Sequence, residues 1–175
     1  MNVTQSLPWR DADPRMLQAC VGVLTDIDDT LTRDGDIEPA ALQALGRLQR
    51  AGVPVIAVTG RPMGWSKPLV SHWPVNAIVA ENGAVALQHR DNQVHVSYVQ
   101  DEATRSHNSA RLQSIAAQIV RDVPGAMLAQ DSAGRVTDVA IDHSEFAQLD
   151  AASINGVVAM MRAHGMTATV SSSCS

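Results

Sequence analysis

Three aspartates follow a short apolar segment near the N-terminus, in the stretch VGVLTDIDDTLT at residues 21–32. Asp26, Asp28 and Asp29 fall within four consecutive positions, with no lysine or arginine beside them. Like charges at this spacing repel, so each carboxylate must be solvated or paired. Mg²⁺ removes the repulsion, because it is usually held by one or two carboxylates and a substrate phosphate. The spacing therefore predicts a magnesium site with Asp26 and Asp28 as ligands, unless the aspartates only cap a helix and shape a turn.

The segments that must position these carboxylates alternate between strand and helix. Apolar runs at 21–25, 53–58 and 77–80 predict three strands. Pro39 begins a helix with leucines at helical spacing, and Gly52 ends it. Strands that are apolar on both faces and joined by helices indicate a parallel sheet covered by helices. In such sheets, ligands bind beyond the carboxyl ends of the strands.

Polar residues stand at all three of these strand ends. Asp26 follows the first strand, Thr59 and Gly60 follow the second, and Glu81 and Asn82 follow the third. Because the carboxyl ends of parallel strands meet at one edge of a sheet, we expect these residues to line the same ligand site.

The second half of the chain predicts a different architecture. A hairpin over 85–99 is followed by a helix over about 101–122, strands over 126–130 and 135–141, a helix that ends near Gly165, and a strand over 166–170. This order indicates a small α+β module packed beside the parallel sheet. The expected division is therefore a core at residues 1–99, which includes the hairpin, and the module at residues 100–175.

Composition restricts the partners and the compartment. Thirteen basic residues against 18 acidic ones give a formal charge of −5 without a basic stripe, which excludes nucleic acid and membrane as partners and favours a small molecule. Cys20 and Cys174 lie far apart and outside any metal-binding spacing, which indicates two reduced thiols. The sequence has no apolar N-terminal leader and no uncharged apolar stretch of about 18 residues. We therefore expect a cytoplasmic protein.

Three stretches resemble motifs of one enzyme superfamily. TDIDDTLT resembles the DxDx[TV] signature of the haloacid dehalogenase (HAD) superfamily, whose members are mostly Mg²⁺-dependent phosphatases. VIAVTGRP resembles its second motif, an apolar strand that ends in threonine or serine. AENGA is similar to a stretch in the branch that carries its cap after the third strand, which includes sugar-phosphate phosphatases. The resemblance implies a Rossmann-like core with an α+β cap inserted after the third strand.

The resemblance also implies a role for each candidate site residue. Asp26 would attack phosphorus to form an aspartyl-phosphate, and Asp28 would act as general acid and base while its main-chain carbonyl reaches Mg²⁺. Thr59 and the backbone amide of Gly60 would bind the phosphoryl oxygens, because an anion can approach closely where there is no Cβ. Asn82 would hydrogen-bond the substrate or a catalytic loop. The substrate would be a small phosphorylated metabolite such as a sugar phosphate.

Two parts of the family pattern are missing. A third motif normally supplies a lysine or arginine, a fourth supplies an acidic GDxxND-like turn, and both follow the cap. Lys67, the only lysine, comes directly after the second motif, on the wrong element. We interpret three later acidic residues as hairpin-turn and exposed-strand positions of the cap: Asp131, Asp138 and Asp142. The resemblance therefore implies a C-terminally truncated chain in which part of the core is missing and activity is weak or absent.

In the family, a strand from beyond the cap pairs with the strand of the nucleophile. Without it, we expect an open sheet edge and an uncovered apolar flank, which allow pairing with another chain or a second copy. The main alternative to a phosphatase is thus a noncatalytic fragment that acts by binding or by association. A receiver-type phosphoacceptor domain is disfavoured, because residues 55–59 end in threonine where a receiver has its acceptor aspartate.

Overall fold

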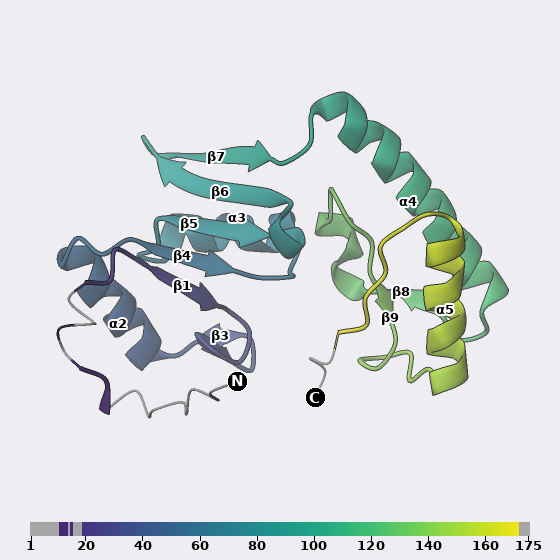
Figure 1. The fold of residues 1–175 in the computed structure, drawn as a ribbon, viewed down its shortest axis with the longest axis horizontal. Helices are drawn as coiled ribbons and strands as arrows, with labels where there is room; N and C mark the ends of the chain where they lie inside the picture. The colour runs from purple at the N-terminus through teal and green to yellow at the C-terminus, as the bar shows by residue number, and fades with distance from the viewer. Residues whose placement is uncertain (1–10, 14, 16–18, 172–175) are drawn as a thin grey trace, which may run out of the picture.

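The computed structural model describes residues 11–13, 15 and 19–171, which form two packed parts (Figure 1). One part is a five-stranded sheet with its helices, and the other is a module that faces the carboxyl ends of the parallel strands. The predicted α/β fold with a Rossmann-like parallel-sheet core is confirmed. Cys20 is exposed, and Cys174 lies outside the described residues.

The central sheet combines parallel and antiparallel strands in the order β1-β4-β5-β6-β7. The strands are β1 (Val23–Asp26), β4 (Val55–Val58), β5 (Ala77–Ala80), β6 (Val85–Arg90) and β7 (Gln93–Tyr98). The first three are parallel, and their register sets Asp26 opposite Val58, so the residues that follow β1 and β4 lie side by side. The predicted hairpin is confirmed, with Asp91 and Asn92 at its turn, both at positive φ.

Two helices cover one face of the sheet. They are α2 (Pro39–Arg50) and α3 (Met63–His72), and a small hairpin of β2 (Thr32–Arg33) and β3 (Asp36–Ile37) precedes α2. As predicted, Pro39 stands at the start of α2, and Gly52 follows its end with a φ of 72°. Leu45 of α2 and Val70 of α3 are buried against the strands. The connections from β1 to β4 and from β4 to β5 run in the same direction along the sheet. Because crossovers between parallel strands are right-handed, both helices lie on the same face.

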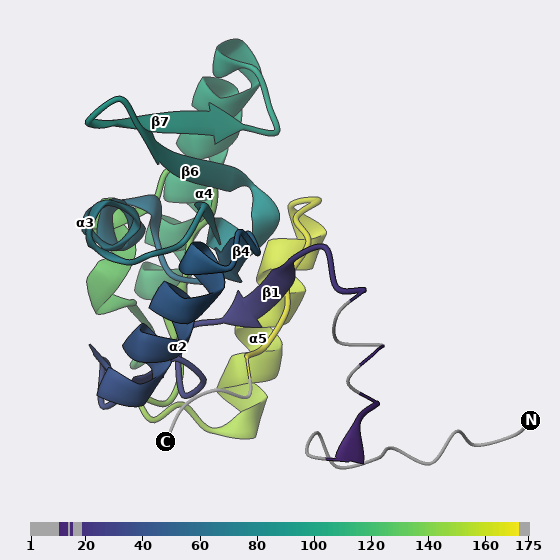
Figure 2. The same cartoon turned by 90° about the vertical axis from the view of Figure 1, so that its left-hand side faces the viewer.

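β1 lies at one end of the sheet and β7 at the other (Figure 2). Within the described residues, β1 pairs only with β4. Leu24 lies on the face opposite the helices and is 73% exposed. Val21, which precedes the strand, is 91% exposed. The expected open edge and uncovered apolar flank are therefore present in the described part of the chain.

The second module is built on two helices. Its elements are α4 (Glu102–Asp122), β8 (Met127–Leu128), the 3₁₀ helix η3 (Gln130–Gly134), β9 (Ile141–Asp142) and α5 (Ala151–Ala163). Ile115 and Ile119 of α4 pack against Val157 of α5, as the apolar pattern predicts. None of the described helices is both long and apolar enough to cross a membrane.

The strand predictions for this module are largely wrong. The strands expected over 126–130 and 135–141 shrink to the two-residue pairs of β8 and β9, because residues 135–138 bond to the core instead of to a neighbouring strand. The strand expected over 166–170 does not form. The pairing of β8 and β9 covers only two residues and so offers a short edge for a further strand. Ala168, in the middle of the expected strand, is buried at 8% exposure.

The core and the module meet at a buried carboxylate. Glu81, in the 3₁₀ helix η2 (Glu81–Gly83), is 2% exposed and accepts a hydrogen bond from the N–H of Met63 at the start of α3 (2.9 Å). It also accepts from the N–H groups of Val136 (3.1 Å) and Thr137 (2.6 Å) in the module. The Thr137 hydroxyl donates to it as well. One side chain therefore joins three separate segments of the chain.

Asp142 organises the loop between β9 and α5. Its carboxylate, in a residue that is 7% exposed, accepts hydrogen bonds at 2.8 to 3.1 Å from the backbone N–H groups of residues 144–147. Burial by itself raises the pKa of Asp142, but these four donors outweigh it and hold that pKa below its ordinary value. Asp142 therefore does not lie on an exposed strand face, as interpreted from the sequence; it is buried at the end of β9 and shapes the turn that follows.

Replacing Leu24 by lysine is expected to weaken any self-association through β1, because a charge on an edge strand opposes strand pairing. Sedimentation velocity at increasing protein concentration would measure this for the wild type, Leu24→Lys and the control Phe146→Lys, which changes an exposed apolar residue (53%) of the other module. A wild-type chain that stays monomeric at all concentrations contradicts the prediction.

Glu81→Ala is expected to lower the free energy of unfolding by about 3 kcal/mol or more, since several buried N–H donors lose a charged acceptor. Glu81→Gln should also destabilise, because its amide nitrogen would face some of those donors. Urea unfolding would compare both with Glu145→Gln, which changes an exposed glutamate. Equal stability of all variants would show that Glu81 does not join the segments.

Asp142→Asn is expected to lower stability at neutral pH by about 1–2 kcal/mol, because a carboxylate is the better acceptor for the four N–H groups. A group whose pKa falls on folding stabilises while it is ionised, so the wild-type advantage should persist above the ordinary value of 3.8 and disappear as pH falls through the lowered pKa. Thermal unfolding of both proteins between neutral and acid pH tests this. A difference that does not change with pH would count against the carboxylate as its source.

Candidate active site

The loop after β1 is anchored by Ile27, whose side chain is fully buried. Its carbonyl oxygen accepts hydrogen bonds from the N–H groups of Leu31 (2.9 Å) and Thr32 (3.1 Å) and from the Thr32 hydroxyl (3.1 Å). This turn places Asp26 and Asp28 on either side of the buried residue, at the carboxyl end of β1 and out of the core.

Asp28 is bound from both sides by residues that follow β4. The Thr59 hydroxyl donates to Oδ2 of Asp28 (3.3 Å), while Nε and Nη2 of Arg61 contact Oδ1 at 3.2 and 3.1 Å. Thr59 is 3% exposed, and its Oγ1 accepts a hydrogen bond from the N–H of Arg61 (3.0 Å). The structure thus brings Asp28 and Thr59 together, as expected. Arg61 belongs to the VIAVTGRP stretch, but no local pattern in that stretch indicates its contact with Asp28.

Asp26 is exposed at the end of β1. Its main-chain carbonyl accepts from the Thr25 hydroxyl (2.9 Å), but its carboxylate makes no ion pair or side-chain hydrogen bond with any described residue. The carboxylate is therefore accessible to a ligand, and it lies on the strand next to the one that leads into Thr59.

Gly60 and Asn82 meet where the loops after β4 and β5 approach each other. A Cβ on Gly60 would lie 3.2 Å from Oδ1 of Asn82, so a side chain there would force one of them to move. Asn82 has a φ of 55°, and its Nδ2 donates to Oδ2 of Asp138 in the module (3.1 Å). Nη1 of Arg135 donates to the carbonyl of Gly60 (3.3 Å). The module therefore contacts both loops.

Arg135 is the centre of a charged cluster in the module. Its side chain is 10% exposed, between Asp131 (2.9 Å) and Asp138 (2.9 Å). Burial by itself lowers the pKa of Arg135, but the two carboxylates outweigh it and hold that pKa above its ordinary value. The interpretation of Asp131 and Asp138 as mere turn and exposed-strand residues is therefore wrong, because both fix Arg135 and Asp138 also reaches Asn82.

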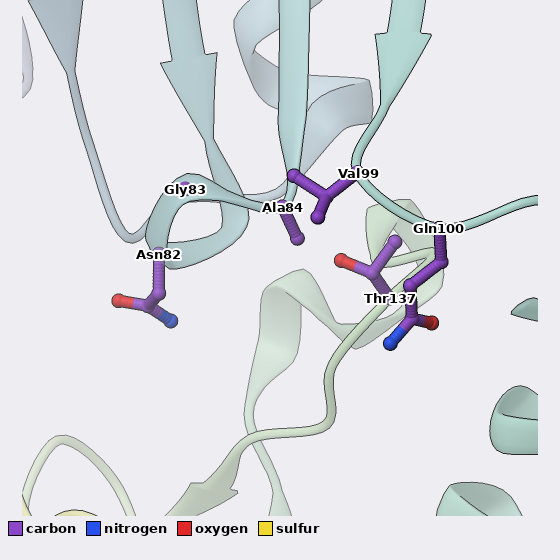
Figure 3. Close-up of a pocket in the computed structure, with 6 residues that line it drawn as sticks. All are labelled: Asn82, Gly83, Ala84, Val99, Gln100 and Thr137. Atoms are coloured by element: carbon purple, nitrogen blue, oxygen red, sulfur yellow. The ribbon is translucent and has the colours of Figure 1, made fainter.

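A pocket of about 270 Å³ begins at Asn82 and extends toward the connection between β7 and α4 (Figure 3). Three small or apolar residues line it, namely Gly83, Ala84 and Val99. Three polar side chains complete the lining, namely Asn82, Gln100 and Thr137. It therefore lies on the β7 side of Asn82, whereas Asp26 and Asp28 lie on the β1 side. Asn82 borders both regions.

The oxygens at the end of β1 fit a hard cation only in part. No group of three or more histidine, cysteine, aspartate and glutamate side chains is placed to hold a metal in the part of the chain that the structure describes. The Asp26 carboxylate and the main-chain carbonyl of Asp28 have no hydrogen-bonding partner among those same residues, whereas the Asp28 carboxylate is occupied by Arg61 and Thr59. One carboxylate and one carbonyl suit Mg²⁺, which usually keeps several waters and binds substrate phosphate as well.

Comparison with known proteins agrees with the fold. Residues 23–142 match the family described as haloacid dehalogenase-like hydrolase. A crystal structure of a Thermoplasma acidophilum protein superposes with a TM-score of 0.62 and 16% identity, over 81% of this chain and 56% of that one. No protein of the curated collection matches.

Two structures of lower similarity carry the word phosphatase in their names. A trehalose-6-phosphate phosphatase related protein gives a TM-score of 0.49 and 15% identity, over 85% of this chain and 64% of that one. A HAD subclass IIB sugar phosphatase gives 0.46 and 13%, over 79% of this chain and 62% of that one. The chain thus spans less than two thirds of each of these three structures.

The match extends from the first residue of β1 through β9 and so includes the loops that carry Asp26, Asp28 and Thr59. It covers well over half of the chain, and the first three strands are parallel, as the alternation of strands and helices predicts. The chain belongs to the haloacid dehalogenase-like hydrolases.

Proposed function

We propose that this chain is a phosphate-monoester hydrolase in which Asp26 attacks phosphorus. The observation that carries the proposal is that Asp26 is exposed and its carboxylate is unpaired within the described chain. The buried hydroxyl of Thr59 and the N–H of Gly60 follow the neighbouring strand, and both groups suit an anion. Membership of a hydrolase family supports the same reaction class.

The reaction has two steps. An oxygen of Asp26 forms a bond to phosphorus as the bond to the leaving alcohol breaks, and the departing oxygen takes a proton from the carboxylic acid form of Asp28. Asp28, now a carboxylate, then removes a proton from a water molecule that attacks the same phosphorus. The bond between phosphorus and Asp26 breaks, inorganic phosphate leaves, and both side chains return to their starting forms.

The other residues bind and orient. Thr59 and the N–H of Gly60 hold the phosphoryl oxygens. The single hydrogen of the Thr59 hydroxyl, which Asp28 accepts in the structure, turns to a phosphoryl oxygen when substrate binds, and Arg61 then keeps Asp28 in place. The Asp26 carboxylate and the Asp28 carbonyl would hold Mg²⁺, which when bound would offset the negative charge that the phosphate brings to the carboxylates.

The substrate class follows from the pocket beyond Asn82. Carboxamide and hydroxyl groups of Asn82, Gln100 and Thr137 line it, and such groups hydrogen-bond the hydroxyls of a sugar. Because the Thr137 hydroxyl donates to Glu81, it offers its lone pairs to a ligand. A small sugar phosphate of the cytoplasm, with its phosphate at Thr59 and its sugar toward Gln100, is therefore the proposed substrate.

A noncatalytic fragment that binds another chain remains the second candidate, and one observation favours it. The edge of β1 is unpaired within the described residues, and Leu24 is exposed beside it. Strand addition at such an edge would bury Leu24 and complete the hydrogen bonding of β1.

Asp26→Asn is expected to reduce Mg²⁺-dependent hydrolysis of p-nitrophenyl phosphate by at least about 1,000-fold, because the covalent step loses its nucleophile. Asp29→Asn is the matched control, since Asp29 is exposed at a φ of 56° where asparagine is well tolerated. A chelator should abolish the wild-type rate, and added Mg²⁺ should restore it. Equal background from the wild type and Asp26→Asn would favour the noncatalytic fragment.

A further inference from the structure

We propose that Arg61 binds the phosphoryl group through its Nη1, as the cation for which the sequence offers no suitable lysine. This inference rests on the proposed site for phosphate at the ends of β1 and β4. It assigns the missing positive charge to a residue that follows β4 directly, rather than to a segment beyond the second module.

The position of Arg61 is fixed by the loop that would bind phosphate. Its N–H donates to Oγ1 of Thr59 (3.0 Å), and its guanidinium contacts Asp28 through Nε (3.2 Å) and Nη2 (3.1 Å). The backbone and the side chain of Arg61 therefore both touch residues assigned to phosphate binding or proton transfer. The charge lies within the site without any movement of the second module.

The guanidinium of Arg61 is held in one orientation, and its Nη1 group makes no hydrogen bond to a described residue. The ring of Trp65 lies 5.3 Å from its central carbon, and this cation-π contact, together with the two bonds to Asp28, fixes its plane. Arginine has five N–H donors, and the Nη1 group of Arg61 donates to none of the described residues. The side chain as a whole is 43% exposed, and we assign a ligand oxygen as the partner of Nη1.

The other cations near the site are less available. Arg135 is 10% exposed and is bound by two carboxylates and the carbonyl of Gly60. Lys67 lies inside α3, one turn beyond the residues that begin it, and it makes no ion pair with a described residue. Arg61 alone among these three combines exposure, an unused donor group and direct contact with Asp28.

The chemistry of the site needs such a charge. A phosphate dianion placed beside the Asp26 carboxylate would meet a like charge, and arginine is suited to bridge the carboxyl group of Asp28 and a phosphate because its planar fork can bind both at once. Nε and Nη2 remain on Asp28 while Nη1 binds a phosphoryl oxygen. Arg61 thereby offsets the charge of the incoming group and keeps Asp28 next to it.

The first test measures binding rather than turnover. Inorganic phosphate is titrated in the presence of Mg²⁺ against the thermal unfolding of the wild type, Arg61→Gln, Arg61→Lys and Arg121→Gln. Arg121 is the matched control, because it makes an exposed ion pair with Asp122 at the end of α4. Circular dichroism without phosphate confirms that each variant is folded.

Arg61→Gln is expected to weaken the apparent affinity for phosphate about 10-fold or more, the effect of losing a charge-assisted hydrogen bond. Arg61→Lys should recover part of the loss, and Arg121→Gln should bind as the wild type does. Wild-type affinity in Arg61→Gln, or no stabilisation of the wild type by phosphate, would overturn the assignment.

The second test separates this inference from the proposed reaction. If Asp26→Asn abolishes hydrolysis while Arg61→Gln binds phosphate normally, the reaction stands and the role of Arg61 is wrong. If phosphate binding depends on Arg61 while the wild type and Asp26→Asn show the same background rate, Arg61 stands as an anion ligand and the proposed hydrolysis is wrong. For an active enzyme, Arg61→Lys should raise KM for p-nitrophenyl phosphate more than Arg121→Gln does.

Discussion

The buried carboxylate of Glu81 is the interaction on which the arrangement of this protein depends. It stands directly after β5 and receives hydrogen bonds from the start of α3 and from residues 136–137 of the module. Beside it Gly64 and Gly134 bring two backbones together, where a Cβ on Gly64 would lie 3.0 Å from the other chain segment. Because a buried charge must be fully hydrogen-bonded, the three segments can be assembled in few other ways.

This junction also shapes the site. Because residues 136–137 are held at Glu81, Arg135 reaches the carbonyl of Gly60 and Asp138 reaches Asn82. The module therefore fixes the loops after β4 and β5. Charges alternate through the whole region, from Asp28 and Arg61 to Arg135 and its two carboxylates. A site for an anion between acidic residues requires such nearby cations, and both arginines are supplied within the described chain.

The edge at β1 places the proposed nucleophile in an unusual setting. Asp26 ends a strand that pairs on one side only within the described residues, and the apolar side chain of Leu24 lies open on the same strand. An unpaired edge opens and exchanges more readily than a central strand, because its backbone groups bond to water on one side. The proposed catalysis at Asp26 and the proposed association through β1 therefore depend on the same four residues, and a partner strand would stiffen the end that carries Asp26.

The sequence by itself determined the elements of the core and the strand-end residues, since apolar periodicity, Pro39 and Gly52 act locally, and the motifs TDIDDT and TGRP stand at the ends of strands. Tertiary structure decided what those residues contact. Arg61 meets Asp28 across 33 positions, and Glu81 meets Val136 across 55, which no local pattern records. The same long-range bonds turned residues 135–138 away from the strand that their composition favours, because satisfying a buried carboxylate outweighs β-propensity in a short, half-buried segment.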